Sequence, residues 1–264
     1  MKQSKPPTLA TKTRETHEER IPAIWMTLLM CVASQPVGAQ DTVDLSGTWS
    51  FQLDDDHVGQ RERWFDKDLK DGILLPGSTD ERGFGVKAVE PQETRLTREY
   101  RYVGPAWYQK TFEIPASWQG KRAELFLERA MWETKVWLDG HYIGLQDSLC
   151  VPHRFDLSDY LTPGKHRLTL RIDNRLKINV GHERGWSRMW AMSLTEESQT
   201  NWNGAIGRLE IRITDPVWIE RVEAHPDIDK KATRIKAYLR SRIGAVSGEI
   251  TVSASCGNHN LGPV

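Results

Sequence analysis

Cysteine is scarce in this chain of 264 residues, which has three: Cys31, Cys150 and Cys256. A small secreted domain that is held together by disulfides needs paired cysteines at short spacings. Cys31 lies in an N-terminal apolar segment, and the other two are far apart in sequence. We therefore expect a fold held by its hydrophobic core, with Cys150 and Cys256 as ordinary small buried residues.

The chain also lacks an excess of charge of either sign, because 36 Lys and Arg balance 36 Asp and Glu. Proteins that bind nucleic acids usually carry a basic excess or a basic stripe. Neither feature is present, so we expect no nucleic acid among the partners of this protein.

No apolar run has the length of about 20 residues that a membrane-spanning helix requires. The stretch from Ile21 to Ala33 instead has the length of the hydrophobic part of a signal peptide, and Val37-Gly38-Ala39 is typical of a cleavage site. We expect residues 1–39 to be a signal peptide, the mature protein to be periplasmic or extracellular, and no membrane attachment after cleavage. Three glutamates before Arg20 are atypical, so an uncleaved anchor or a misassigned start codon is an alternative.

Familiar catalytic signatures are missing as well. The sequence has no Gly-x-Ser-x-Gly, no His-Glu-x-x-His, no Cys-x-x-Cys and no P-loop. The acidic stretch Asp54-Asp55-Asp56-His57 follows a strand-like run, and we interpret it as a solvated turn rather than a metal site. These observations predict no metal and no cofactor.

Short alternating or apolar runs dominate the chain beyond residue 40, and no amphipathic helix of three turns interrupts them. Asp139-Gly140 predicts a two-residue hairpin turn, because both positions tolerate a positive φ. Thr162-Pro163-Gly164-Lys165 predicts a turn that leads into a long strand. About eight strands between residues 43 and 214 favour an all-β fold, a jelly-roll β-sandwich, over residues 40–215.

Asp215-Pro216 marks a predicted domain boundary. Three strand-like runs follow it, at 217–222, 233–239 and 248–254. An immunoglobulin-like sandwich has about seven strands and about 100 residues. We therefore interpret residues 216–264 as the start of such a sandwich, that is, as a truncated immunoglobulin-like domain of a longer protein.

Seven short motifs follow one another along the chain: Leu45-Ser46-Gly47-Thr48-Trp49, Leu75-Pro76-Gly77-Ser78-Thr79-Asp80, Gly104-Pro105-Ala106-Trp107-Tyr108, Val136-Trp137-Leu138-Asp139-Gly140, Pro152-His153-Arg154-Phe155-Asp156-Leu157, Leu170-Arg171-Ile172-Asp173-Asn174 and Asn201-Trp202-Asn203-Gly204-Ala205-Ile206-Gly207. In this order they resemble the N-terminal sugar-binding domain of glycoside hydrolase family 2, the β-galactosidase and β-glucuronidase family. Each motif is weak alone, and the resemblance depends on their order from about residue 43 to 230. The closing motif has the form found in Bacteroidetes-type members.

The resemblance implies a hydrolase of O-glycosidic bonds in carbohydrate metabolism, with a retaining mechanism on a C-terminal (β/α)₈ barrel that carries two glutamates. The acid/base glutamate of this family normally follows an asparagine, and this chain contains no Asn-Glu dipeptide. We expect no catalytic residue here, a barrel in a further part of the parent protein, and no activity of this chain alone. The β-glycoside substrate would be bound through the parent's active site.

Two loops are the candidates for carbohydrate binding. Asn201, Trp202 and Asn203 offer amide groups for sugar hydroxyls and an indole face for a sugar ring, and Asp80 lies in the other loop. The alternative is that Trp202 is buried, both asparagines hold a sandwich corner and Asp80 caps a turn. The polar, Trp-rich segment 181–198 is either a packed loop or a pocket wall formed by Trp186 and Trp190.

Two other classes of protein fit parts of the sequence. A jelly roll with surface tryptophans would suffice for a free-standing carbohydrate-binding module, although the half-domain from residue 217 argues against it. A secreted structural β-sandwich without sugar contacts is the second alternative. In any of these classes, we expect most of the 11 tryptophans to be core residues of the β-sandwich.

Overall fold

The computed structural model describes residues 41–89, 98–175, 201–230, 232–252, 254–256 and 259–261. These residues are almost entirely β, and the two short helical segments are the 3-10 turns η1 (Trp64–Asp66) and η2 (Ala116–Trp118). The predicted all-β sandwich is confirmed. None of the helices in these ranges has the length and apolarity needed to cross a membrane. The expected signal peptide, residues 1–39, lies outside the described residues.

The first sheet has five strands, and all its pairings are antiparallel. Its two central strands are long, with 11 and 10 residues. In spatial order the sheet consists of β1 (Asp41–Asp44), β13 (Gly204–Thr214), β8 (Arg122–Met131) and β11 (His153–Asp156), and β4 (Gly77–Ser78) pairs with the start of β13.

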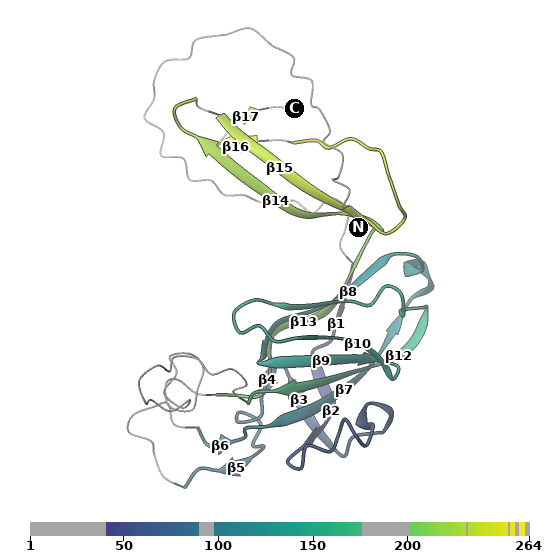
Figure 1. Ribbon diagram of the computed structural model, residues 1–264, viewed down its shortest axis with the longest axis vertical. Coiled ribbons are helices and arrows are strands. Elements are labelled where there is room, and N and C mark those ends of the chain that lie inside the picture. The colour runs from purple at the N-terminus through teal and green to yellow at the C-terminus, as the bar shows by residue number, and fades with distance from the viewer. Residues whose placement is uncertain are drawn as a thin grey trace, which may run out of the picture. The chain divides into compact units, whose positions relative to one another are not determined.

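The second sheet has six antiparallel strands. Figure 1 shows β7, β2 and β3 of this sheet running side by side. The spatial order is β10 (His141–Gln146), β9 (Glu133–Leu138), β12 (Gly164–Asp173), β7 (Pro105–Ile114), β2 (Gly47–Leu53) and β3 (Asp71–Leu75).

The two sheets enclose one hydrophobic core. Leu125 and Leu127 from β8 join Leu168 and Leu170 from β12 in a single cluster, and all four are fully buried. Side chains at alternate positions of a strand point to the same face, so each strand supplies every second residue to this core. The core thereby holds the loops at the sandwich ends in fixed positions.

The turn predictions are confirmed. Asp139 and Gly140 have positive φ and join β9 to β10, with Leu138 paired to His141. Gly164, also at positive φ, lies within the predicted turn of residues 162–165 and is the first residue of the long strand β12 (Gly164–Asp173). The prediction of a buried Cys150 was wrong: this residue is exposed, because it lies in the loop between β10 and β11, which runs over the surface.

The chain beyond residue 216 forms two hairpins. The runs at 217–222 and 233–239 belong to β14 (Val217–Asp227) and β15 (Ala232–Ser241), which pair with each other. The third predicted strand, 248–254, was wrong over 248–252, where the structure is irregular and a β partner is missing from the described residues. Short strands β16 (Ala254–Cys256) and β17 (His259–Leu261) form a second hairpin, and β5 (Val86–Lys87) pairs with β6 (Tyr100–Arg101).

The chain divides into two compact units, residues 36–247 and residues 1–35 with 248–264. The first unit contains both sheets and the β14–β15 hairpin. The described part of the second unit is residues 248–252 and the β16–β17 hairpin.

Candidate functional site

The loops that surround the starts of β7 and β13 and the end of β12 form one corner of the sandwich. The side chain of Asn174, directly after β12, accepts a hydrogen bond from the Gly104 backbone amide at 2.8 Å and donates to the Tyr102 carbonyl at 2.9 Å. Asn174 is fully buried, so these bonds tie the entry to β7 to the exit from β12.

Asn203 completes this corner. Its Oδ1 accepts a hydrogen bond from the Tyr108 hydroxyl at 2.7 Å, and its Nδ2 donates to the carbonyls of Gly104 at 2.8 Å and Ile172 at 3.1 Å. Burial raises the pKa of Tyr108 well above 10, so this phenol remains a hydrogen-bond donor. The Asn203 side chain is fully buried, and its bonds hold the corner in one conformation.

Asn201 lies two residues earlier and has different partners. Its Nδ2 donates to the Asn174 carbonyl at 2.8 Å. The Arg98 guanidinium donates to the Asn201 backbone carbonyl, and the same Nη1 lies 4.0 Å from Oδ2 of Asp80. Arg98 therefore joins the loop around Asp80 to the loop around Asn201. We call Thr79, Asp80, Arg98 and Asn201 the rim cluster.

Three oxygen atoms of the rim cluster are buried without a hydrogen-bond partner among the described residues: Thr79 Oγ1, Asp80 Oδ1 and Asn201 Oδ1. Thr79 is 1% exposed and Asn201 4% exposed. A buried polar atom without a partner costs about 1–3 kcal/mol, so such atoms are rare in folded proteins and call for an explanation. All three can accept a hydrogen bond, and the Thr79 hydroxyl can also donate one.

The electrostatic environment of Asp80 follows from this burial. Burial raises the pKa of the Asp80 carboxyl above its ordinary value of 3.8, and the nearby Arg98 charge offsets this only in part. The Asp80 side chain is 14% exposed and that of Arg98 is 7% exposed. The cluster thus contains one buried cation and one buried carboxylate whose second oxygen is unpaired.

The sequence-based candidates are therefore divided between two roles. Asp80 and Asn201 meet through Arg98, whereas Asn203 has all its amide groups engaged in the corner. Trp202 is half-buried between the two asparagines. Sequence reasoning did not identify Arg98 or Thr79. Arg98 lies 103 positions from Asn201 in a polar segment, so no local pattern distinguishes it from other arginines.

The stretch Asp54-Asp55-Asp56-His57 is a turn, as predicted, but Asp54 within it is buried rather than solvated. Its carboxylate accepts hydrogen bonds from the amides of Val58 and Gly59 and from the Trp107 indole. In the part of the chain that the structure describes, no group of three His, Cys, Asp or Glu side chains is arranged to hold a metal ion. Trp186 and Trp190 lie outside the described residues.

Comparisons with a family model and with curated proteins indicate the same family. Residues 43–203 match the family model for the sugar binding domain of glycosyl hydrolases family 2. A β-glucuronidase from Paenibacillus borealis is 31% identical over 134 residues, which is 50% of this chain and 21% of the relative. A β-galactosidase from Pectobacterium atrosepticum is 25% identical over 233 residues, covering 83% of this chain and 22% of the relative.

Solved structures agree on the fold. A β-glucuronidase from an uncultured Clostridium species superposes with a TM-score of 0.59 at 22% identity, over 77% of this chain and 34% of that protein. The chain thus spans about a fifth of its curated relatives and a third of this structural neighbour. Because the family model covers most of the sandwich, from β1 to the start of β13, this chain belongs to glycosyl hydrolases family 2 and contains the sugar binding domain of that family.

Proposed function

We propose that this chain is the N-terminal, non-catalytic part of an exported, retaining glycoside hydrolase that acts on β-glycosides, and that the rim cluster contributes hydrogen bonds to the sugar. Family membership supports the reaction class, since the relatives are named as β-glucuronidases and β-galactosidases. Export rests on the apolar segment 21–33 and the small residues that follow it.

The observation that carries the proposal is the set of unpaired buried oxygens in the rim cluster. A sugar hydroxyl can donate one hydrogen bond and accept others, so it can pair with acceptors that the protein leaves without donors. Asp80 Oδ1 and Asn201 Oδ1 would accept hydrogen bonds from sugar hydroxyls, and Arg98 would hold the two loops at a fixed separation. Trp202 beside them would supply an apolar face.

The reaction itself would take place on another part of the parent protein. A retaining glycosidase needs one carboxyl group to protonate the leaving oxygen and a second, about 5 Å away, to attack the anomeric carbon. The family places this pair on a (β/α)₈ barrel, and the described ranges of this chain show no strand–helix alternation of that kind. The rim cluster would then lie at the edge of the substrate pocket and act in binding rather than in bond cleavage.

Binding is tested on the chain itself by NMR. Methyl β-D-galactoside and methyl β-D-glucuronide are titrated into ¹⁵N-labelled protein, and the side-chain amide of Asn201 and the backbone amides of Thr79 and Asp80 are followed. We expect shifts at these signals that are lost in Asp80→Ala and Asn201→Ala and retained in Asp227→Ala, an exposed-hairpin control. No shift with either sugar, or equal shifts in all variants, would contradict the binding role.

Catalysis is tested separately with aryl β-galactosides and aryl β-glucuronides. This chain should show only background hydrolysis, and the parent protein should hydrolyse at least one of the substrates. Turnover by this chain that disappears on substitution of a carboxylate between residues 43 and 214 would place an active site on the sandwich and refute the proposal.

A further inference from the structure

The outer face of the six-stranded sheet is divided into two parts. One part is covered by the loop between β2 and β3, whose apolar residues pack on the sheet. Phe65 stacks on Trp137 with ring centroids 5.2 Å apart, and Trp107 stacks on Trp137 at 5.1 Å. Leu69 completes this second, smaller hydrophobic cluster. The loop therefore fills this half of the face and excludes ligands from it.

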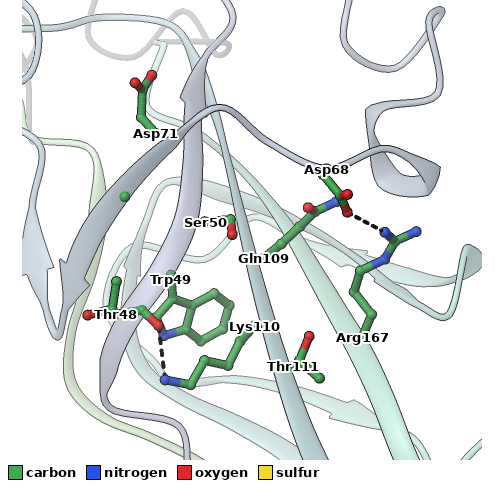
Figure 2. Close-up of a pocket in the computed structure, with 10 residues that line it drawn as sticks. Thr48, Trp49, Ser50, Asp68, Asp71, Gln109, Lys110, Thr111 and Arg167 are labelled. Atoms are coloured by element: carbon green, nitrogen blue, oxygen red, sulfur yellow. Dashed lines mark hydrogen bonds and ion pairs between the residues drawn. The ribbon is translucent and has the colours of Figure 1, made fainter.

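The other part of the same face is left open as a hollow of about 360 Å³ over β3, β2, β7 and β12. A volume of this order is at the lower end of the range for small-molecule sites. Its floor is formed by small side chains on neighbouring strands, Thr48, Ser50 and Thr111, together with Gly72. Asp71 and the Asp68–Arg167 pair flank the Ser50 hydroxyl on opposite sides (Figure 2).

One wall of the hollow is fixed by hydrogen bonds. The Gln109 amide nitrogen donates to the backbone carbonyls of Trp64 at 3.0 Å and Lys67 at 2.9 Å. These bonds hold the side chain in one orientation and leave its carbonyl oxygen as the group that can accept a bond from a ligand. Arg167 is held in the same way, by Asp68 and by the Phe65 carbonyl, each at 3.3 Å. The side chains of Gln109 and Arg167 are therefore already oriented in the absence of a ligand.

The charges that line the hollow balance. Lys110 and Arg167 are offset by Asp68 and Asp71, and the Lys110 ammonium already donates to the carbonyls of Ser46 and Thr48. An ionic ligand would gain little from a site of zero formal charge. The remaining groups are hydroxyls and amide or carboxylate oxygens, which suit a ligand that both donates and accepts hydrogen bonds.

We propose that this hollow is a binding subsite for a neutral saccharide, separate from the rim cluster. Leu74, the cross-strand partner of Thr48, is 47% exposed at its edge and can contact the C–H face of a sugar ring. The pair Thr111–Arg167 lies six positions along the β7–β12 ladder from Pro105–Asp173, at the corner that holds the rim cluster. Six positions correspond to about 20 Å, so one monosaccharide does not fill both sites.

All the groups that line the subsite come from the described part of this chain, so its binding can be tested on this chain. Trp49, the aromatic residue of its lining, belongs to the main core and is only 1% exposed, so it offers no open ring face to a sugar. The subsite should therefore bind with a dissociation constant in the millimolar range. It would hold a distant part of a longer glycan while the rim cluster contacts the end that is cleaved.

The first test of this proposal is a substitution that fills the hollow with a larger side chain. A Cβ at Gly72 would meet its nearest neighbours, Thr48 Cγ2 and the Trp49 carbonyl, at 3.7 and 3.9 Å, which are ordinary contacts. Gly72→Val should therefore fold and place its methyl groups in the hollow. Gly144→Val is the matched control, because Gly144 lies on the opposite edge strand of the same sheet and its added Cβ would also make an ordinary contact, 3.6 Å from Phe155.

A second pair of variants removes a hydroxyl without changing shape. Thr111→Val changes the floor of the hollow, and Thr42→Val changes an exposed threonine on β1 of the other sheet. Thermal melting of all four variants establishes that they fold.

The measurement is an NMR titration of the ¹⁵N-labelled chain with methyl β-D-galactoside, a neutral sugar. A parallel titration uses methyl β-D-glucuronide, which carries a negative charge. We expect the galactoside to shift the amides of Ser50, Gly72 and Thr111, with affinity at least five-fold lower in Gly72→Val and Thr111→Val and unchanged in the two controls. No shift at these amides, shifts that persist in folded Gly72→Val, or shifts with the glucuronide alone would each overturn the proposal. Signals of Thr79 and Asn201 report the rim cluster separately, so failure of one site is distinguishable from failure of the other.

Discussion

Asn201 and Asn203 are two residues of one type in one loop, both almost completely buried, yet their surroundings differ. Asn203 makes three side-chain hydrogen bonds that join three segments of the sandwich. Asn201 makes one, and its Oδ1 has no partner in the described residues. Burial alone therefore does not distinguish the two residues. The unpaired Oδ1 of Asn201 is the feature that separates it from Asn203.

The same contrast holds between two aspartates. Asp54 is 2% exposed, and both its oxygens accept hydrogen bonds from the loop that follows β2 or from Trp107. Asp80 is also largely buried, but its Oδ1 is unpaired and burial raises its pKa. The side chains of Asn203 and Asp54 thus use their hydrogen-bonding groups within the fold, whereas oxygens of the rim cluster remain unpaired in the described residues.

The largest expected effect is that of Asn203→Ala. It leaves the Tyr108 hydroxyl and the carbonyls of Gly104 and Ile172 without their partner, so the free energy of unfolding should fall by about 4 kcal/mol. Asn201→Ala, the matched control, removes one bond and should cost about 1 kcal/mol. Urea unfolding of both variants measures the difference, and equal losses would remove the contrast between the two residues.

Asp54→Ala should have the next largest effect. It leaves the amides of Val58 and Gly59 and the indole of Trp107 unpaired, and we expect a loss of about 3 kcal/mol. Near-ultraviolet circular dichroism should change as well, since Trp107 packs against Trp137. Asp56→Ala, two residues away and exposed, is the control and should leave stability within error.

Arg98→Met should cost less, about 2 kcal/mol, because methionine preserves most of the packing while the donor to Asn201 and the partner of Asp80 are lost. The Arg98 charge lowers the Asp80 pKa, so its removal should raise that pKa further. A ¹³C titration of the Asp80 carboxyl follows this shift. Arg98→Lys retains the positive charge, so the Asp80 pKa should return toward its value in the unmodified protein, although lysine does not reproduce the arginine hydrogen bond to the Asn201 carbonyl. If Arg98 acted through packing alone, the lysine variant would not restore the pKa.

Sequence patterns were sufficient to predict the architecture, because strands and turns are specified by residues that are close together in the sequence. Alternating apolar residues identify the strands of the sandwich, and the Asp139-Gly140 turn lies where both residues adopt positive φ. The strand expected at 248–254 was wrong over its first part, since apolar alternation predicts a strand only if a partner strand is available. The first two runs after residue 216 succeeded because they pair with each other.

The candidate site could be predicted only in part. The motifs around Asp80 and Asn201 carried a family resemblance, which located the two loops but not the difference between Asn201 and Asn203. That difference depends on which backbone groups surround each amide after folding. Arg98 illustrates the same limit, because its link to Asn201 crosses 103 positions of sequence. The hollow on the outer sheet face is also invisible in the sequence, since its residues come from four strands and one loop.

The smallest expected effect is a pH dependence at Asp80. Its folded-state pKa is raised above the ordinary value of 3.8, because burial disfavours the charged carboxylate. The folded state therefore binds the proton more tightly than the unfolded chain, and the stability contributed by this group falls as the pH rises from about 3.8 through the folded pKa. At neutral pH Asp80→Asn should be slightly more stable than the unmodified protein, because an amide does not carry the buried charge. The gain should shrink as the pH falls through the Asp80 pKa and vanish below 3.8, where both states of Asp80 are protonated.

Urea midpoints of the two proteins at several pH values between 3.5 and 7 provide the comparison. Asp227→Asn is the control of opposite sign. The backbone and side-chain hydrogen bonds of Lys230 lower the Asp227 pKa, so replacing this carboxylate should reduce stability above pH 3.8. A gain for Asp80→Asn that is independent of pH would show that the substitution acts by shape rather than by charge. A loss at neutral pH would mean that the ion pair with Arg98 outweighs the burial of Asp80, and the rim cluster would then resemble the fully paired corner around Asn203.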